Sequence, residues 1–186
     1  MKNIFLIGTG LIGGSMLKDL RTHYPEAAFY GIDEKEIHVQ KAKEKGIIDQ
    51  VARFEDLKTA DLVIISIPVD ATLEVLPRVL GFVNENTLVI DVGSTKEAIC
   101  KCVVNHKNRR SFLATHPIAG TEFSGPEAAV LNLFYKKTMI VCEVEKTAFP
   151  LQEKAIAIFD LLGMRVRYMT SAAHDKHIAY VSHLSH

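Results

Sequence analysis

The chain has 186 residues, of which 48% are hydrophobic, so it can bury the core of one large domain. Its 22 Lys and Arg residues balance its 22 Asp and Glu residues, which argues against an overall field suited to nucleic acid or an anionic membrane. Its three cysteines include no Cys-x-x-Cys pair, so a disulfide scaffold or a structural zinc site is not expected, and the count fits a reducing compartment.

The N-terminus runs from Lys2 directly into an apolar segment and lacks the small-residue cleavage site of a signal peptide. No apolar run approaches the roughly 18 residues needed to span a membrane. The short basic run at 107–110 is expected to be a solvated loop. We therefore expect a soluble, cytoplasmic protein that binds neither nucleic acid nor a membrane.

The first segment predicts a dinucleotide-binding turn. An apolar run at 4–7 precedes a Gly-x-Gly-x-x-Gly pattern, and an amphipathic helix follows, which is the order that this pattern requires. Gly8 permits the tight turn, Gly10 lets a pyrophosphate approach the backbone, and Gly13 lets the helix pack closely on the strand. Free amides at the helix start would face the anion. The residues expected to bind the cofactor here are Gly8, Thr9, Gly10, Leu11, Ile12 and Gly13.

An acidic residue supports this interpretation. Asp33 lies 20 residues beyond Gly13, at the end of a second apolar run at 29–32. A carboxylate there can accept hydrogen bonds from a ribose 2′-hydroxyl and would repel a 2′-phosphate, so the predicted cofactor is NAD. The alternative is a glycine turn that binds no ligand.

The rest of the chain alternates strand patterns with helical ones. The run at 60–67 is apolar enough to be buried on both faces, as a parallel sheet requires. Such alternation predicts right-handed crossovers and an α/β fold with a doubly wound, mostly parallel sheet of the Rossmann type. Further strands are predicted at 87–92, 111–115, 138–142 and 165–168.

Two polar groups are predicted to follow strands at the carboxyl edge of the sheet, where ligands of such folds bind. Ser66, Ile67 and Pro68 would flank the cofactor, or they form a plain strand-ending turn. Ser94 follows the strand at 87–92 and is a candidate for a catalytic role. Alternatively it caps the next helix, with Glu97 completing a capping box.

His116 is the sharpest catalytic candidate. It follows the predicted strand at 111–115, and Pro117 restricts its backbone. An imidazole has the pKa suited to accepting a proton near neutral pH. The alternative is a surface histidine at a strand end.

The final segment is predicted to be helical and carries four histidines in two His-x-x-His spacings. At about 100° per residue, His183 and His186 share a face, whereas His174 and His177 lie on the other side, near Ile178. The four side chains therefore do not converge, and no metal site is expected. A polar face with His183 and His186 turned toward a cleft is predicted; the alternative is a solvated face.

Four stretches together and in this order resemble the prephenate dehydrogenase family, which includes arogenate dehydrogenases. They are residues 8–15, 91–94, 116–122 and 182–186, and the resemblance extends over the whole chain. The stretch His-Pro-Ile-Ala-Gly-Thr-Glu at 116–122, together with the C-terminal histidines, is more specific to the family than the glycine pattern.

The resemblance implies a role for five residues. His116 would be the catalytic histidine, which takes the proton of the substrate's ring hydroxyl, and Ser94 would orient it and help to hold the nicotinamide or the substrate. Glu122 would gate or polarise the site. His186 would lie near the substrate, with His183 supporting it.

The implied activity is the NAD-dependent oxidative decarboxylation of prephenate to 4-hydroxyphenylpyruvate in tyrosine biosynthesis. Two alternatives remain open: an arogenate dehydrogenase that gives tyrosine directly, and a dinucleotide-sensing domain without catalysis. Another β-decarboxylating or hydroxyacid dehydrogenase of this fold would need its own lysine-based or other catalytic helix, of which the sequence shows no sign beyond Lys176.

The resemblance also implies a division into domains. Family members continue into an all-helical second domain that dimerises and supplies a substrate-binding arginine. We expect residues 1–169 to form the dinucleotide-binding domain and residues 170–186 to form the first helix of a truncated second domain. The expected partners are the small-molecule substrate and, through the part missing here, a second copy of the chain. Two departures from the family pattern are Ser185, where proline is common, and Phe123, where a polar residue is frequent.

Overall fold

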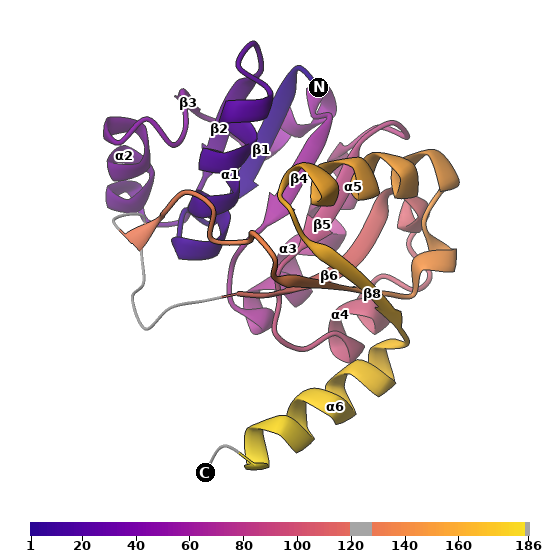
Figure 1. Cartoon of the computed structure of the whole chain (residues 1–186). Coiled ribbons are helices and arrows are strands. Elements are labelled where there is room, and N and C mark those ends of the chain that lie inside the picture. The colour runs from indigo at the N-terminus through magenta and orange to yellow at the C-terminus, as the bar shows by residue number, and fades with distance from the viewer. Residues whose placement is uncertain (120–127, 185–186) are drawn as a thin grey trace.

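The structure, a computed structural model, describes residues 1–119 and 128–184 (Figure 1). Eight strands in this part of the chain form one sheet in the order β3-β2-β1-β4-β5-β6-β7-β8. The strands are β1 (Asn3–Ile7), β2 (Ala28–Ile32), β3 (Gln50–Val51), β4 (Leu62–Ile65), β5 (Leu88–Asp91), β6 (Phe112–Ile118), β7 (Thr138–Cys142) and β8 (Arg165–Met169). The α-helices are α1 (Leu11–His23), α2 (Glu36–Glu44), α3 (Val69–Phe82), α4 (Glu97–Cys102), α5 (Phe149–Leu161) and α6 (Ser171–Leu184).

The sheet has the predicted doubly wound topology. Neighbouring strands from β3 to β6 pair in parallel, and the chain order reverses between β1 and β4. β7 is antiparallel to β6, and β8 is parallel to β7. The predicted α/β fold with a mostly parallel sheet is therefore confirmed. No described helix is both long and apolar enough to cross a bilayer.

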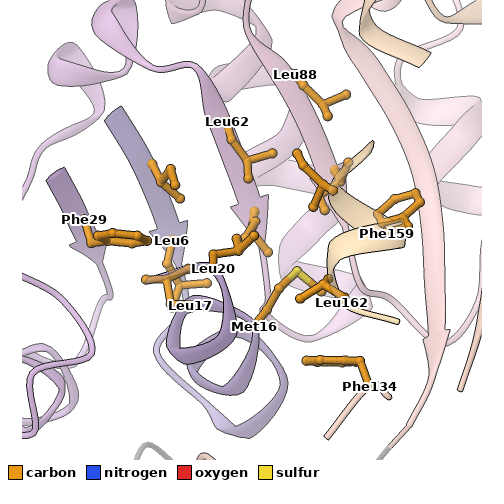
Figure 2. Close-up of a cluster of buried hydrophobic side chains, with 14 of the residues drawn as sticks. Leu6, Met16, Leu17, Leu20, Phe29, Leu62, Leu88, Phe134, Phe159 and Leu162 are labelled. Carbon is orange, nitrogen blue, oxygen red and sulfur yellow. The ribbon is translucent and has the colours of Figure 1, made fainter. Parts of the chain in front are cut away.

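Both faces of the sheet are covered, which explains the uninterrupted apolar runs in its central strands. Successive residues of β1 point to opposite sides, so Leu6 joins the core beneath α1 and α5, whereas Phe5 joins the core beneath α3 and α4. Figure 2 shows the first of these two cores, in which Met16 and Leu20 of α1 and Phe159 of α5 meet the strands. The sheet is thus the middle of three layers, and packing on both faces holds the strand ends at its carboxyl edge in place.

β6 is longer than its sequence pattern predicts. The strand was expected to end at 115, but it continues to Ile118, so His116 and Pro117 lie inside it. Only Phe112 and Leu113 pair with β5, and the rest of the strand pairs with β7 alone. Pro117, which has no N–H to donate, is tolerated there because this part of β6 has no paired strand on the side of β5. His116 therefore lies beyond the carboxyl end of β5 and is held by an antiparallel neighbour.

α6 begins against α4 and then extends away from the sheet (Figure 1). Its buried residues are Ser171 and His174, both in the first turns. The N–H and the hydroxyl of Ser171 donate hydrogen bonds to Oε1 of Glu143, at 3.0 and 2.8 Å, and so tie the helix start to the end of β7. The first turns of α6 are therefore fixed to the sheet.

The close packing of α1 on the sheet gives a test of the fold. A Cβ at Gly13 would lie 2.5 Å from Cδ1 of Leu6 and 2.8 Å from Cβ of Ser66, whereas one at Gly81 in α3 would meet nothing within 4 Å. We expect Gly13→Ala to lower the free energy of unfolding by about 1–3 kcal/mol through overpacking. The control Gly81→Ala should leave it unchanged or raise it by up to about 1 kcal/mol. Urea unfolding measures both, and equal stability of the two variants would contradict the packing.

Candidate nucleotide-binding and active site

The glycine turn between β1 and α1 leaves room for a ligand at one position. Gly8 has φ +87°, and a Cβ on it would lie 2.2 Å from the carbonyl oxygen of Ser66, so glycine is required for the turn itself. A Cβ at Gly10 would have no atom within 4 Å. The backbone at Gly10 therefore faces open space at the start of the helix.

Two amides of the turn are available to that space. The N–H of Gly13 donates to Oγ of Ser66 at 3.1 Å, and the N–H of Gly14 donates to the carbonyl of Gly10 at 2.9 Å. Within the described part of the chain, no hydrogen bond is found for the N–H groups of Leu11 and Ile12. Unpaired amides at a helix N-terminus favour an anion such as pyrophosphate.

A cavity of about 620 Å³ opens beside this turn at the carboxyl ends of β1, β2 and β4. Its wall includes Gly8, Thr9 and Gly10, together with Asp33 and the predicted flanking residues Ser66, Ile67 and Pro68. Leu11, Ile12 and Gly13 continue from the wall into the first turn of α1. The structure thus brings the predicted cofactor-binding residues together at one place.

Asp33 is bonded to the glycine turn as well as facing the cavity. Its Oδ2 accepts hydrogen bonds from the N–H and the hydroxyl of Thr9, both at 3.0 Å, and its Oδ1 accepts from the N–H of Lys35 at 2.9 Å. Nδ1 of His38 lies 3.7 Å from Oδ2. The carboxylate therefore fixes the shape of the turn, a function that sequence reasoning did not anticipate.

Phe54 and Arg78 form a part of the cavity wall that sequence analysis missed. The guanidinium of Arg78, in α3, lies 4.4 Å from the centroid of the Phe54 ring, at the start of the 3₁₀ segment η1 (Phe54–Thr59). Such a stacked pair presents a flat, partly apolar surface. Neither residue stands in a recognisable local motif, because the pair forms only when the two segments meet in space.

His116 lies at the same carboxyl edge, two strands away from β4. Its Nδ1 is 2.8 Å from Nε2 of His174, in α6. Burial, with smaller contributions from the neighbouring His174 and Lys96, lowers the pKa of His116 to about 4. His116 is therefore a neutral imidazole at pH 7 and can accept a proton.

His174 is in turn bonded to its neighbour in the chain. Its Nδ1 lies 2.7 Å from Oδ1 of Asp175, whose two oxygens also accept the N–H groups of Lys96 and Glu97 at 2.7 and 2.9 Å. Asp175 therefore caps the N-terminus of α4 from another helix. The predicted capping box of Ser94 with Glu97 is wrong, because α4 has Lys96 at its N-cap and no capping side chain of its own.

The remaining predicted site residues are placed as follows. Ser94 is exposed at the carboxyl edge, and in the described ranges no hydrogen bond joins it to His116. His183 is exposed on α6, while Glu122 and His186 lie outside the described residues. No cluster that could hold a metal is found among residues 1–119 and 128–184. The histidine that does reach His116 is His174, which is fully buried, although the other residues on its side of the helix, such as His177 and Val181, are exposed.

A doubly wound sheet with a glycine turn at its first strand and an acid at the end of its second defines the class of dinucleotide-binding domains. Residues 16–168 match the family model described as the nucleotide-binding domain of prephenate dehydrogenase. The chain therefore belongs to the prephenate dehydrogenase family.

Individual relatives agree with this assignment. The prephenate dehydrogenase of Lactococcus lactis subsp. cremoris is 33% identical over 193 residues, which cover 100% of this chain and 51% of the relative. The structure of Aquifex aeolicus prephenate dehydrogenase superposes with a TM-score of 0.92 at 32% identity, over 100% of this chain and 68% of that one. Synechocystis arogenate dehydrogenase gives a TM-score of 0.88 at 28% identity, over 98% and 64%. The chain spans about half to two thirds of the length of the curated relatives that it matches along its whole length.

The open space at Gly10 gives a test of the nucleotide site. We expect Gly10→Ala to change the free energy of unfolding by less than about 0.5 kcal/mol, since the added methyl group meets no protein atom. The same methyl group would occupy the approach of a pyrophosphate, so the affinity for NAD should fall about 10-fold or more. Calorimetric titration and urea unfolding measure the two effects. Unchanged NAD affinity would rule out pyrophosphate binding at Gly10.

Proposed function

We propose that this chain is the NAD-binding and catalytic part of a dehydrogenase that oxidatively decarboxylates prephenate to 4-hydroxyphenylpyruvate, a step of tyrosine biosynthesis. The observation that carries the proposal is the half-buried imidazole of His116, which its lowered pKa keeps neutral at pH 7, at the same sheet edge as the glycine turn. Relatives of at least 30% identity that bear the name prephenate dehydrogenase support this substrate. The second candidate is arogenate, supported by the Synechocystis relative.

The residues at the glycine turn fit NAD. The open space at Gly10 and the amides of Leu11 and Ile12 would hold the pyrophosphate, and Asp33 would accept from the ribose hydroxyls. A related structure, that of Aquifex aeolicus prephenate dehydrogenase, is a complex with hydroxyphenyl propionate and NAD+, at 31% identity and a TM-score of 0.86. Bound NAD supplies a nicotinamide ring that accepts a hydride.

The protein's own part in the reaction is small. His116 would accept the proton of the substrate's ring hydroxyl as the carbonyl forms there, and loss of carbon dioxide leaves an aromatic ring. Because burial holds the pKa of His116 near 4, the imidazole is unprotonated over the physiological range. The remaining task is to orient the two reactants at the edge of the sheet.

Four further residues complete the proposed site. Ser94 is exposed beside the N-terminus of α4 and is available to the nicotinamide or the substrate. Glu122 would gate or polarise the site, His186 would lie near the substrate, and His183 would support it. We further propose that residues 1–169 form the dinucleotide-binding domain and that 170–186 begin a helical domain through which two copies dimerise.

The choice of cofactor can be tested at Asp33. We expect NAD to bind more tightly than NADP. Asp33→Asn should lower the ratio of the dissociation constant for NADP to that for NAD by about 10-fold, because the charge that repels a 2′-phosphate is removed. Thr9→Val is the control, since it removes one hydrogen bond to Asp33 and keeps the charge. Titration calorimetry with both cofactors measures the effect. Tighter binding of NADP by the unmodified chain would refute the role of Asp33.

The proposed activity can be tested at His116 in the whole polypeptide that carries this chain. We expect His116→Asn to lower kcat about 10²-fold or more, with NAD affinity kept, because the proton acceptor is lost. His23→Asn, at the exposed end of α1, is the control and should keep the wild-type rate. Steady-state rates with prephenate and with arogenate measure both the activity and the preferred substrate. A near-normal rate in His116→Asn would contradict the assignment.

A further inference from the structure

We propose that His174 is a positioning residue of the site, which accepts a hydrogen bond from Nδ1 of His116 and thereby leaves Nε2 of His116 free to take a proton. The inference rests on the proposed function, in which His116 is the proton acceptor. The inference gives the first turns of α6 a part in the site, in addition to the glycine turn and the strands.

The contact between the two histidines is made through their nitrogens. The 2.8 Å distance from Nδ1 of His116 to Nε2 of His174 is a hydrogen bond. The rings meet at 76°, with centroids 5.0 Å apart, so they are not stacked. His174 is fully buried, so water does not reach its Nε2, whereas His116 is half-buried.

Asp175 sets the direction of the hydrogen bonds. Although burial alone would raise its pKa, hydrogen bonds from His174 and from the N–H groups of Glu97 and Lys96 hold it below the usual value. Asp175 is therefore an ionised carboxylate, which can only accept hydrogen bonds. The proton shared between Asp175 and His174 consequently belongs to Nδ1 of His174.

The rest of the assignment takes His174 and His116 as neutral imidazoles, each with one N–H and one acceptor nitrogen. With its proton on Nδ1, His174 presents an acceptor at Nε2. His116 must then be the donor in the contact between them, so its own proton is on Nδ1 and its Nε2 carries a lone pair. Two consecutive hydrogen bonds thus select one tautomer of His116, as a buried acid does for a catalytic histidine elsewhere.

The protein holds His174 rigidly in this position. The carboxylate of Asp175 accepts hydrogen bonds from two amides at the start of α4, and the N–H of Ser171 donates one to Glu143 at the end of β7. His174 lies between these two anchors on the buried side of α6. The orientation of His116 therefore depends on a helix that begins beyond the last strand of the sheet.

The tautomer can be read directly by nitrogen NMR of the 15N-labelled chain, in which protonated and unprotonated imidazole nitrogens give distinct shifts. At neutral pH we expect His116 to be protonated at Nδ1 and unprotonated at Nε2. His174→Phe keeps a ring but removes the acceptor, so His116 should become a mixture of both tautomers. His174→Gln offers a carbonyl oxygen in its place and should restore the Nδ1–H form.

Kinetics on the whole polypeptide give the second readout. His174→Phe should lower kcat about 10²-fold, with KM and NAD affinity nearly unchanged, and His174→Gln should recover most of the loss. His177→Phe is the matched control, because His177 is exposed on the same helix, and it should retain the wild-type tautomer and rate.

Two results would overturn the inference. One is an Nε2–H tautomer of His116 in the unmodified chain, a measurement that requires no variant to fold. The other is an unchanged tautomer and kcat in His174→Phe. If the unmodified polypeptide turned over neither prephenate nor arogenate, the proposed function would fail, while the tautomer measurement would still decide the role of His174.

Discussion

The buried carboxylate of Asp91 holds together the edge of the sheet at which the candidate site lies. It pairs with the fully buried ammonium of Lys96, and it accepts the N–H groups of Gly93 at 3.0 Å and Thr115 at 3.1 Å. The end of β5, the turn that carries Ser94 and the middle of β6 are thereby joined. Removing one partner of such a pair would leave an uncompensated charge in the core, so the geometry of this edge depends on both.

From this edge the candidate site divides into two parts. The glycine turn, Asp33 and the cavity beside them provide the features that an adenine dinucleotide requires: open backbone, free amides and a carboxylate. The second part is a line of partly buried hydrogen bonds from His116 through His174 to Asp175 and the amides of α4. The first part is common to a broad class of folds, and the second bears on the chemistry.

The sequence was informative where the signal is local. Apolar runs and glycine spacing predicted the strands and the turn because each depends on neighbouring residues, and the alternation of strands with helices predicted the mostly parallel sheet. His116 was selected as a candidate by its type and position. The rest depends on tertiary contacts. Ser94 and Glu97 have the spacing of a capping box, yet the cap of α4 is Asp175, which lies 78 residues beyond Glu97. His174 contacts His116, and Phe54 contacts Arg78, only when distant elements pack together. β6 extends beyond the strand that its sequence predicts because its last residues form backbone hydrogen bonds with β7.

We propose that one edge of the sheet positions a dinucleotide and His116 for the same reaction. A crystal structure of the chain with NAD bound tests it most directly. We expect the pyrophosphate to lie against Gly10, the ribose hydroxyls to lie on Asp33, and carbon 4 of the nicotinamide to face Nε2 of His116 across a gap the width of one substrate ring. A pyrophosphate bound away from the glycine turn, or a nicotinamide directed away from β6, would contradict it.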